Sequence, residues 1–345
     1  MIRLAKRLPI AAAVPLACLI DTVLAVPASA HVKWFCAYDV AGQPVGLENV
    51  LCPDFEFLTG LSILGLMTGG ILENTVVGNS MLRALNRATR VIRENIETIF
   101  RAACAFFFIS IWAIGGILLT PELKTASLLV PAIQLSIAAA MLSRRTMPLA
   151  AAGIFALFNI GIWQYGPFHL ADYPIFLGIA AYLALTGGET DFFGRRPIDV
   201  LRWGAGITLM WASIEKWAYP EWSYPLFIQH PEMALGFSPE FYMRGAGAVE
   251  FALAFSLVWT PLVRRVGAIM LTAMFVSAVF EFGKIDLIGH SLIVVALISV
   301  VADDAGKPVR LRDCWLIPVA YAASLVLFLA TYYVAHAELF GTTIL

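Results

Sequence analysis

The stretch that decides the fold is RRVGAIMLTAMFVSAVFEFGKIDLIGHSLIVVALISVVADD, residues 264–304. It contains two apolar runs, 264–282 and 285–302, which carry few charges and are separated by a short corner at Lys284. A helix needs about 20 mostly apolar residues to cross about 30 Å of hydrocarbon. The stretch therefore predicts two antiparallel helices that span a membrane.

The composition of the whole chain extends this prediction to all 345 residues. Hydrophobic residues make up 60% and charged residues 14%, with a mean hydropathy of +0.81, whereas a soluble domain is about 25% charged. The formal net charge of −1 provides no field that would attract nucleic-acid phosphates. These values exclude a cytosolic globular enzyme, a disordered chain and a nucleic-acid-binding protein. They predict an all-α integral membrane protein.

Residues 1–30 have the pattern of a cleaved secretory signal peptide. A basic start (residues 3–7) precedes an apolar run (residues 8–26) and the A-x-A cleavage site Ala28-Ser29-Ala30. Cleavage after Ala30 would leave His31 as the mature N-terminus, outside the cytoplasmic membrane. The alternative is that this segment stays attached as an uncleaved first helix.

The mature chain contains ten segments that fit membrane-spanning helices. After a periplasmic N-terminal segment, 31–56, they lie at residues 57–79, 99–119, 126–142, 147–165, 169–187, 199–217, 243–261, 264–282, 285–302 and 315–336. The first helix and a basic amphipathic inner loop make up residues 57–98. The last helix and a periplasmic tail make up residues 313–345.

Lysine and arginine indicate on which side of the membrane each loop lies, because cytoplasmic loops carry the basic excess. The predicted inner loops and helix ends contain Arg83, Arg87, Arg90, Arg93, Arg101, Arg144, Arg145, Arg195, Arg196, Arg202, Arg264, Arg265, Lys307, Arg310 and Arg312. The predicted outer side contains Lys33, Lys124, Lys216, Arg244 and Lys284. This bias predicts a multi-pass protein of a bacterial cytoplasmic (inner) membrane, with both mature termini in the periplasm. The arginines of residues 83–97 recur every three or four positions and predict a helix that contacts anionic membrane lipids.

Two parallel units of four helices, residues 99–187 and 199–302, make up most of the predicted bundle, with one helix at each end. Each unit has a basic pair between its second and third helices, Arg144-Arg145 and Arg264-Arg265. Each also has a similar outer corner, YGPFHLADY (165–173) and FGKIDLIGH (282–290). Parallel repeats occur in several transporter folds. Chance similarity between apolar helices is the alternative.

Short motifs in the second unit are those of a known family. RWGAGI (202–207) and IEKW (214–217) begin and end its first helix, Glu250 lies near the outer end of its second, and FGK (282–284) forms its corner. Together they resemble the DoxX family of small four-helix membrane proteins over residues 199–302. Some members of that family are similar to the membrane subunit of thiosulfate:quinone oxidoreductase. The resemblance therefore implies a four-helix unit with a quinone-linked activity.

All five histidines fall at or near the predicted outer side. His31, His169, His230 and His336 are candidate metal ligands, since imidazole suits copper, zinc and iron. An N-terminal histidine can bind a metal through its α-amino group and its ring, which favours copper. The chain has no HExxH, CxxC or other spaced ligand motif. An incidental histidine after the cleavage site is therefore the alternative.

Ionisable residues within the predicted helices form a second candidate site. Such residues are costly in a membrane and usually face a cavity or a partner. Candidate catalytic residues are Glu250, Glu281, Asp286 and His290, and candidate cofactor-binding residues are Lys216 and Tyr242. Asp286 and His290 are four positions apart, on one helix face, and fit an ion pair or a proton relay. A structural network, such as an ion pair between Lys216 and Glu250, is the alternative.

The outer segments contain aromatic residues and two cysteines. The loop 217–242 is rich in tryptophan, tyrosine and phenylalanine, which favours anchoring at the lipid headgroups; a lid over a quinone is the alternative. Cys36 and Cys52 lie on the oxidising side of the membrane, where a disulfide is expected. A disulfide between them would close a loop of the size for which the chain-entropy model gives a stabilisation of about 3 kcal/mol. A thiolate metal site is the alternative.

The leading functional hypothesis is a redox-linked membrane component. It would bind copper, a quinone or both at a site open to the periplasm, and would exchange electrons with a periplasmic or respiratory redox partner. A transporter for a metal ion or small solute is one alternative. A non-catalytic assembly or scaffold factor for a membrane or periplasmic complex is another.

Overall fold

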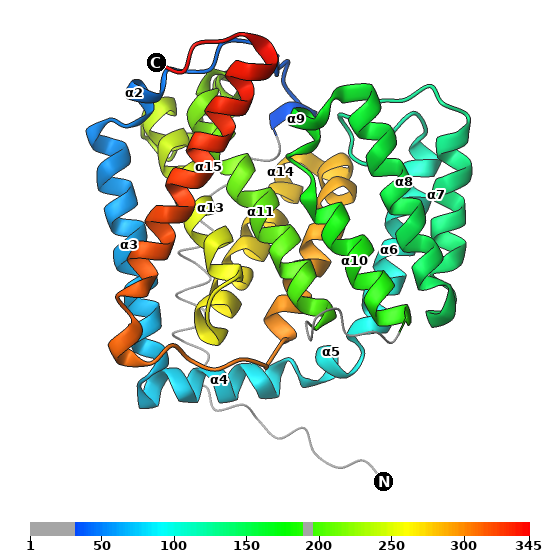
Figure 1. Cartoon of the computed structure of the whole chain (residues 1–345), viewed down its shortest axis with the longest axis horizontal. Coiled ribbons are helices and arrows are strands. Elements are labelled where there is room, and N and C mark those ends of the chain that lie inside the picture. The colour runs from blue at the N-terminus through cyan, green and yellow to red at the C-terminus, as the bar shows by residue number, and fades with distance from the viewer. Residues whose placement is uncertain (1–31, 189–195) are drawn as a thin grey trace.

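The computed structural model describes residues 32–188 and 196–345, and helices dominate it (Figure 1). The structure is 79% helical. Within the described ranges the extended pairing is confined to an isolated bridge between Ile117 and Lys124. The predicted all-α class is therefore confirmed. The predicted signal peptide and His31 lie outside the described residues.

Apart from α4 (Val76–Ala88), which falls largely in the predicted basic amphipathic loop, the longer helices follow the predicted apolar segments. They are α3 (Pro53–Glu73), α4 (Val76–Ala88), α6 (Ile96–Ile114), α7 (Leu129–Ala140), α8 (Met147–Tyr165), α10 (Pro174–Gly188), α11 (Pro197–Ala218), α13 (Pro239–Leu257), α14 (Pro261–Ala302) and α15 (Leu316–Phe340). Short elements connect them: η2 (Val32–Trp34), α2 (Leu47–Val50), α5 (Arg90–Glu94), η3 (Arg144–Thr146), α9 (Pro167–Leu170), η4 (Pro220–Ser223), α12 (Tyr224–Gln229), η5 (Pro231–Ala234) and η6 (Leu311–Asp313). Many helices begin at a proline, whose fixed φ and missing N–H suit the first helical position.

Five helical stretches in the described residues are long and apolar enough to cross a membrane. They are Pro53–Glu73, Ile96–Ile114, Arg144–Tyr165, Pro261–Ala302 and Leu311–Phe340. This confirms a membrane protein with transmembrane helices, but the predicted count of ten spans is not reached. The helices α7 and α10 are apolar but have only 12 and 15 residues. The predicted spans 199–217 and 243–261 fall on α11 and α13, which carry ionisable residues along their length.

The two apolar runs that open the sequence analysis belong to a single long element, α14. It is interrupted at Gly283, whose φ of 70° and ψ of −145° are not helical. Only glycine adopts such a conformation without strain. The predicted corner after Phe282 is therefore a break within α14, where the chain changes direction and goes on as helix.

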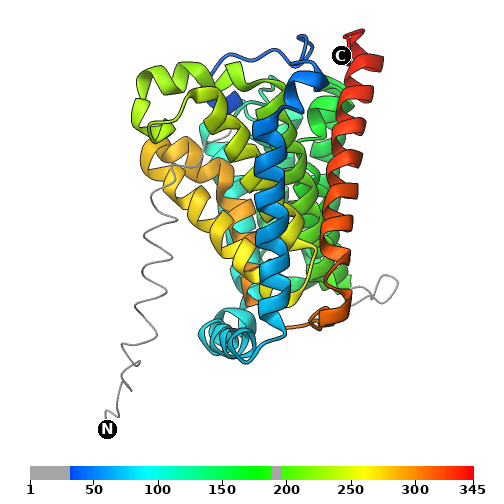
Figure 2. The same cartoon turned by 90° about the vertical axis from the view of Figure 1, so that its left-hand side faces the viewer.

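The long helices lie side by side, and α4 runs across one end of the bundle (Figures 1 and 2). We call this the inner end, and it includes α4, α5 and residues 303–313. The outer end carries residues 32–52, 219–238 and 341–345. The N-terminal and C-terminal segments are joined there, since Leu47 N–H donates to the Ile344 carbonyl at 2.9 Å. The two ends correspond to the predicted inner and outer sides.

The predicted four-helix units meet where α10 packs against α11. Gly178 and Gly204 face each other at this contact, and a Cβ built on Gly178 would lie 3.0 Å from the Gly204 Cα. Small residues let membrane helices approach closely. The helices that carry the polar residues of the two units are therefore brought into direct contact.

Basic residues at the inner end join the starts of α11 and α14 to the end of α14. Arg196 Nη1 lies 2.7 Å from Asp303 Oδ1, and Arg264 Nη2 lies 2.8 Å from Asp303 Oδ2. Burial opposes the charge on Asp303, but hydrogen bonds from Arg196 and the charge of Arg264 hold its pKa below the ordinary value. The basic pair Arg264-Arg265, predicted to lie in a loop, is buried at the start of α14.

Candidate functional site

A small cavity lies between α10, α11, α13 and α14, beside Trp34 of the N-terminal segment. Its apolar wall includes the rings of Trp34, Tyr173, Phe176 and Phe275. Its polar lining is formed by Thr120, Asp172, Thr208, Lys216, Glu250 and His290. The mixture of aromatic walls with a few polar groups is typical of the lining of a small-molecule site.

Two ion pairs from the predicted site lie at this cavity. Lys216 Nζ of α11 lies 2.6 Å from Glu250 Oε2 of α13. In α14, His290 Nδ1 lies 3.1 Å from Asp286 Oδ1. Asp286 is fully buried, and within the described chain neither of its carboxylate oxygens accepts a hydrogen bond. Four of the candidate residues, from three different helices, are therefore brought together.

The N-terminal segment closes the cavity, which the sequence analysis did not anticipate. The Trp34 ring centroid lies 4.4 Å from that of His290. The ring also lies against Gly289, where a Cβ would be 2.2 Å from the nearest Trp34 atom. Phe35 stacks on Phe282 with centroids 4.7 Å apart. Trp34 therefore forms a wall of the cavity. Its ring fits there because Gly289 in the facing helix has no side chain.

A group of buried charges lies beside Trp34, and we call it the Lys33 cluster: Lys33, Glu122, His169, Asp172 and Glu215. The Lys33 ammonium is paired with Asp172 and lies 2.6 Å from Glu215 Oε1. Burial opposes its charge, but the carboxylates of Asp172, Glu215 and Glu122 keep the pKa of Lys33 above its ordinary value. His169 Nε2 lies 2.9 Å from Glu122 Oε1, which also accepts a hydrogen bond from the Tyr173 hydroxyl. The cluster therefore joins both predicted four-helix units through one lysine.

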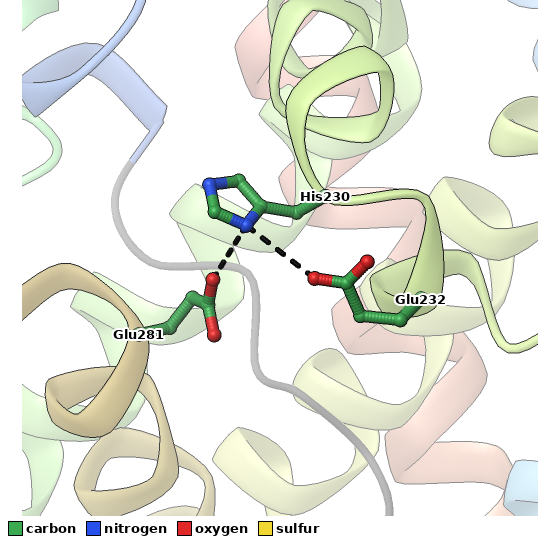
Figure 3. A group of neighbouring side chains, drawn as sticks. All are labelled: His230, Glu232 and Glu281. Carbon is green, nitrogen blue, oxygen red and sulfur yellow. Dashed lines mark ion pairs between the residues drawn. The ribbon is translucent and has the colours of Figure 1, made fainter.

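Two candidate residues of the predicted site lie elsewhere. Glu281 lies beside His230, with Glu281 Oε1 2.6 Å from His230 Nδ1. Glu232 Oε1 lies 3.4 Å from the same nitrogen. Dashed lines mark both pairs in Figure 3. Tyr242 packs in a separate aromatic cluster against Phe227, with ring centroids 5.3 Å apart. Neither Glu281 nor Tyr242 lines the cavity.

The candidate metal ligands are not gathered in one place. His169 belongs to the Lys33 cluster, and His230 lies with two glutamates at the surface. His336 is fully buried, where its ring nitrogens lie 2.7 Å from Thr342 Oγ1 and 2.8 Å from both the Val40 carbonyl and Tyr219 Oη. This histidine joins the N-terminal and C-terminal segments. The group formed by His230, Glu232 and Glu281 has ligand atoms that all lie within 4.8 Å of one another, which suits a metal ion.

The predicted disulfide between Cys36 and Cys52 is not formed, since both cysteines are free. Cys36 lies two residues after Trp34, and its thiol interacts with the backbone of Leu226 in α12. Burial of this thiol raises the pKa of Cys36 above its ordinary value. Cys52, in contrast, is the N-cap of α3. The two thiols therefore have different neighbours, although they are close in the sequence.

Asp172 and Tyr173 lie in the corner 165–173 and Glu215 in the motif 214–217, but the sequence analysis did not predict them as site residues. It missed Lys33 and Trp34 as site residues, because nothing in a short outer segment indicates that it turns into the bundle. The one available signal was the pairing of the corners 165–173 and 282–290, which aligns Tyr173 with His290. Both of these residues line the cavity. No family model, curated protein or solved structure matches the chain.

Proposed function

We propose that this protein binds a quinone in the cavity and acts as a redox-linked component of a bacterial cytoplasmic membrane. The proposal includes ten membrane passes, two of them supplied by α14, and a DoxX-like unit at residues 199–302. The observation that carries it is the buried Asp286–His290 pair in the wall of an aromatic cavity.

The geometry fits the head group of a quinone. Trp34 and Phe275 lie on the His290 ring with centroids 4.4 and 4.7 Å away, so a planar ring would meet aromatic surfaces. His290 Nδ1 faces Asp286, which leaves Nε2 as the nitrogen that can donate to a quinone carbonyl.

Quinone reduction consumes two electrons and two protons and yields a quinol. In this proposal, His290 delivers protons, and Lys216 with Glu250 forms the opposite polar wall. The electrons come from a periplasmic or respiratory redox partner, which the protein contacts at its outer end. The chain itself supplies binding, orientation and proton transfer.

The test is titration of the purified protein with decylubiquinone, followed by tryptophan fluorescence, together with extraction of any quinone that co-purifies. We expect wild type to bind and His290→Ala to bind about 5- to 150-fold more weakly, since a buried quinone carbonyl left without its hydrogen bond costs about 1–3 kcal/mol. His230→Ala is the matched control, because His230 lies outside the cavity. Equal binding by both variants would contradict the proposal. Solute uptake into liposomes without quinone binding would favour a transporter.

A metal site is the second candidate, favoured by the group in Figure 3. His230, Glu232 and Glu281 offer one nitrogen and two carboxylate ligands, which suit zinc, copper(II) or iron(II). Metal analysis of purified wild type beside His230→Ala and Glu281→Gln tests this group, with the exposed Glu240→Gln as control. The same analysis of His31→Ala, with N-terminal sequencing, tests copper binding at the predicted mature N-terminus.

A further inference from the structure

Carboxylates outnumber basic groups around the cavity. Among the described residues that line it, and those joined to them through successive ion pairs or hydrogen bonds, the acidic groups are Glu122, Asp172, Glu215, Glu250 and Asp286. The basic groups are Lys33, Lys216, His169 and His290. Even with both imidazoles protonated, one negative charge is left without a balancing positive charge.

Among the described residues, the other titratable groups that face the Lys33 cluster cannot supply this charge. They are the phenols of Tyr38 in the N-terminal segment, Tyr165 at the end of α8, Tyr173 before α10, Tyr219 after α11, and Tyr332 of α15. Burial raises the pKa of Tyr38 to about 12, and burial also raises the pKa of Tyr219. A phenol is neutral below its pKa, so these groups add no positive charge at neutral pH.

The geometry places the unbalanced negative charge on the carboxylates that share Lys33. The pairs Lys216–Glu250 and Asp286–His290 are each balanced when His290 is protonated. Glu122 is balanced by His169 in the same way. Asp172 and Glu215 remain, and they share the single ammonium of Lys33. Asp172 is 1% exposed and lines the cavity, and its Oδ1 accepts no hydrogen bond from the described residues.

Asp172 and Glu215 are the two carboxyl partners of the Lys33 ammonium. We propose that together they bind one exchangeable proton at neutral pH. An unbalanced charge that is buried in this way is strongly disfavoured, and protonation of a carboxyl removes it. A metal cation fits less well, because it needs several further oxygen ligands while the ammonium already fills the space between the two carboxyls. The Asp172 oxygen at the cavity gives the proton a route to a ligand or to water. This site does not depend on quinone binding.

The direct test is infrared spectroscopy of the full-length, quinone-free protein at varied pH, followed through the carbonyl stretch of a protonated carboxyl. We expect wild type to show this band at neutral pH and to lose it as the pH rises. Glu215→Gln and Asp172→Asn should each lack the band, since a neutral amide balances the charge without a proton. Glu240→Gln, at an exposed glutamate, is the control and should keep it.

The pH dependence of the free energy of unfolding gives a second, independent measurement. The unfolded chain releases carboxyl protons near pH 4, whereas the folded protein would hold this one to higher pH. The stability of wild type should therefore fall as the pH rises from about 4 to the point where the proton leaves, and then level off. Glu215→Gln and Asp172→Asn, where they fold, should not show this fall in stability with rising pH.

Three results would overturn the proposal. The first is a wild-type spectrum without the band at neutral pH, which needs no variant. The second is a band that survives in both amide variants and disappears in Glu122→Gln, which would place the proton elsewhere. The third is stabilisation by sodium, but not by N-methylglucamine, at neutral pH, which would make the occupant a metal cation.

Discussion

Lys33 is the residue whose loss should affect stability most, because it is the buried cation shared by Asp172 and Glu215. Removing one partner of a buried ion pair leaves an uncompensated charge and costs about 3–5 kcal/mol. We expect Lys33→Met to unfold at a clearly lower temperature than wild type, and Lys33→Met with Asp172→Asn to recover part of the loss. The control is Lys284→Met, at an exposed lysine. A Lys33→Met protein as stable as this control would contradict the assignment.

Asp303 should stabilise the inner end in a pH-dependent way. Its pKa in the folded protein is lower than the ordinary value of 3.8, so its stabilising effect is complete above that pH and is lost as the pH falls through the lower value. We expect Asp303→Asn to reduce the free energy of unfolding by about 1.5–3 kcal/mol at neutral pH, since hydrogen bonds to charged groups are lost. The difference from wild type should shrink below pH 3.8. A difference that stays constant in chemical denaturation from pH 7 to pH 3 would show that the carboxylate charge is not responsible.

At the scale of elements, the contact between η2 and α14 shapes the cavity. A Cβ at Gly289 would lie 2.2 Å from the Trp34 ring, so Gly289→Ala must displace the ring or the helix. We expect a loss of stability of about 1–3 kcal/mol, the usual cost of overpacking, and a higher accessibility of tryptophan to iodide quenching. Gly245→Ala in α13 is the matched control, because nothing lies within 4 Å of its added Cβ. Unchanged quenching in Gly289→Ala would mean that Trp34 does not depend on this glycine.

The attachment of α4 and α5 to the bundle depends on Arg265. Its guanidinium donates to Asn86 Oδ1, to Thr89 Oγ1 at 3.1 Å and to the Val301 carbonyl at 2.7 Å. Without it, α4 and α5 should detach from α14 while the long helices stay packed. We expect trypsin to cleave Arg265→Met at the arginines of α4 several-fold faster than wild type. Arg310→Met, at an exposed arginine, should be cleaved at the wild-type rate; equal rates for both variants would contradict this role.

At the scale of the whole molecule, the two ends of the bundle should lie on opposite sides of the membrane. Lys307 is exposed at the inner end and Leu345 at the outer end. In a background with Cys36 and Cys52 replaced by serine, we expect a membrane-impermeable maleimide to label Leu345→Cys in intact cells. It should label Lys307→Cys only after permeabilisation. The reverse pattern would invert the predicted topology.

Much of the architecture follows from local sequence properties. Apolar runs with proline at the first position predict where helices begin, and α14 carries both runs of residues 264–302 with a break at Gly283. The i, i+4 spacing of Asp286 and His290 predicts a pair on one helix face, since that relation holds in any helix. These predictions depend on residues that are close in the sequence. The predicted count of ten spans exceeds what local properties support, because length and hydropathy alone do not decide how α7, α10, α11 and α13 cross the membrane.

The sequence by itself determined that this is an all-α membrane protein, because the scarcity of charge and the length of the apolar runs are properties of the chain. Only the tertiary structure decided which polar residues meet. Lys33 is 139 positions from Asp172 and 182 from Glu215, and Glu281 lies with His230 rather than with His290. The physical reason is that a buried charge must find a partner wherever the packing of helices brings one. That packing depends on long-range contacts, such as Gly178 on Gly204 and Trp34 on Gly289, which no local pattern encodes.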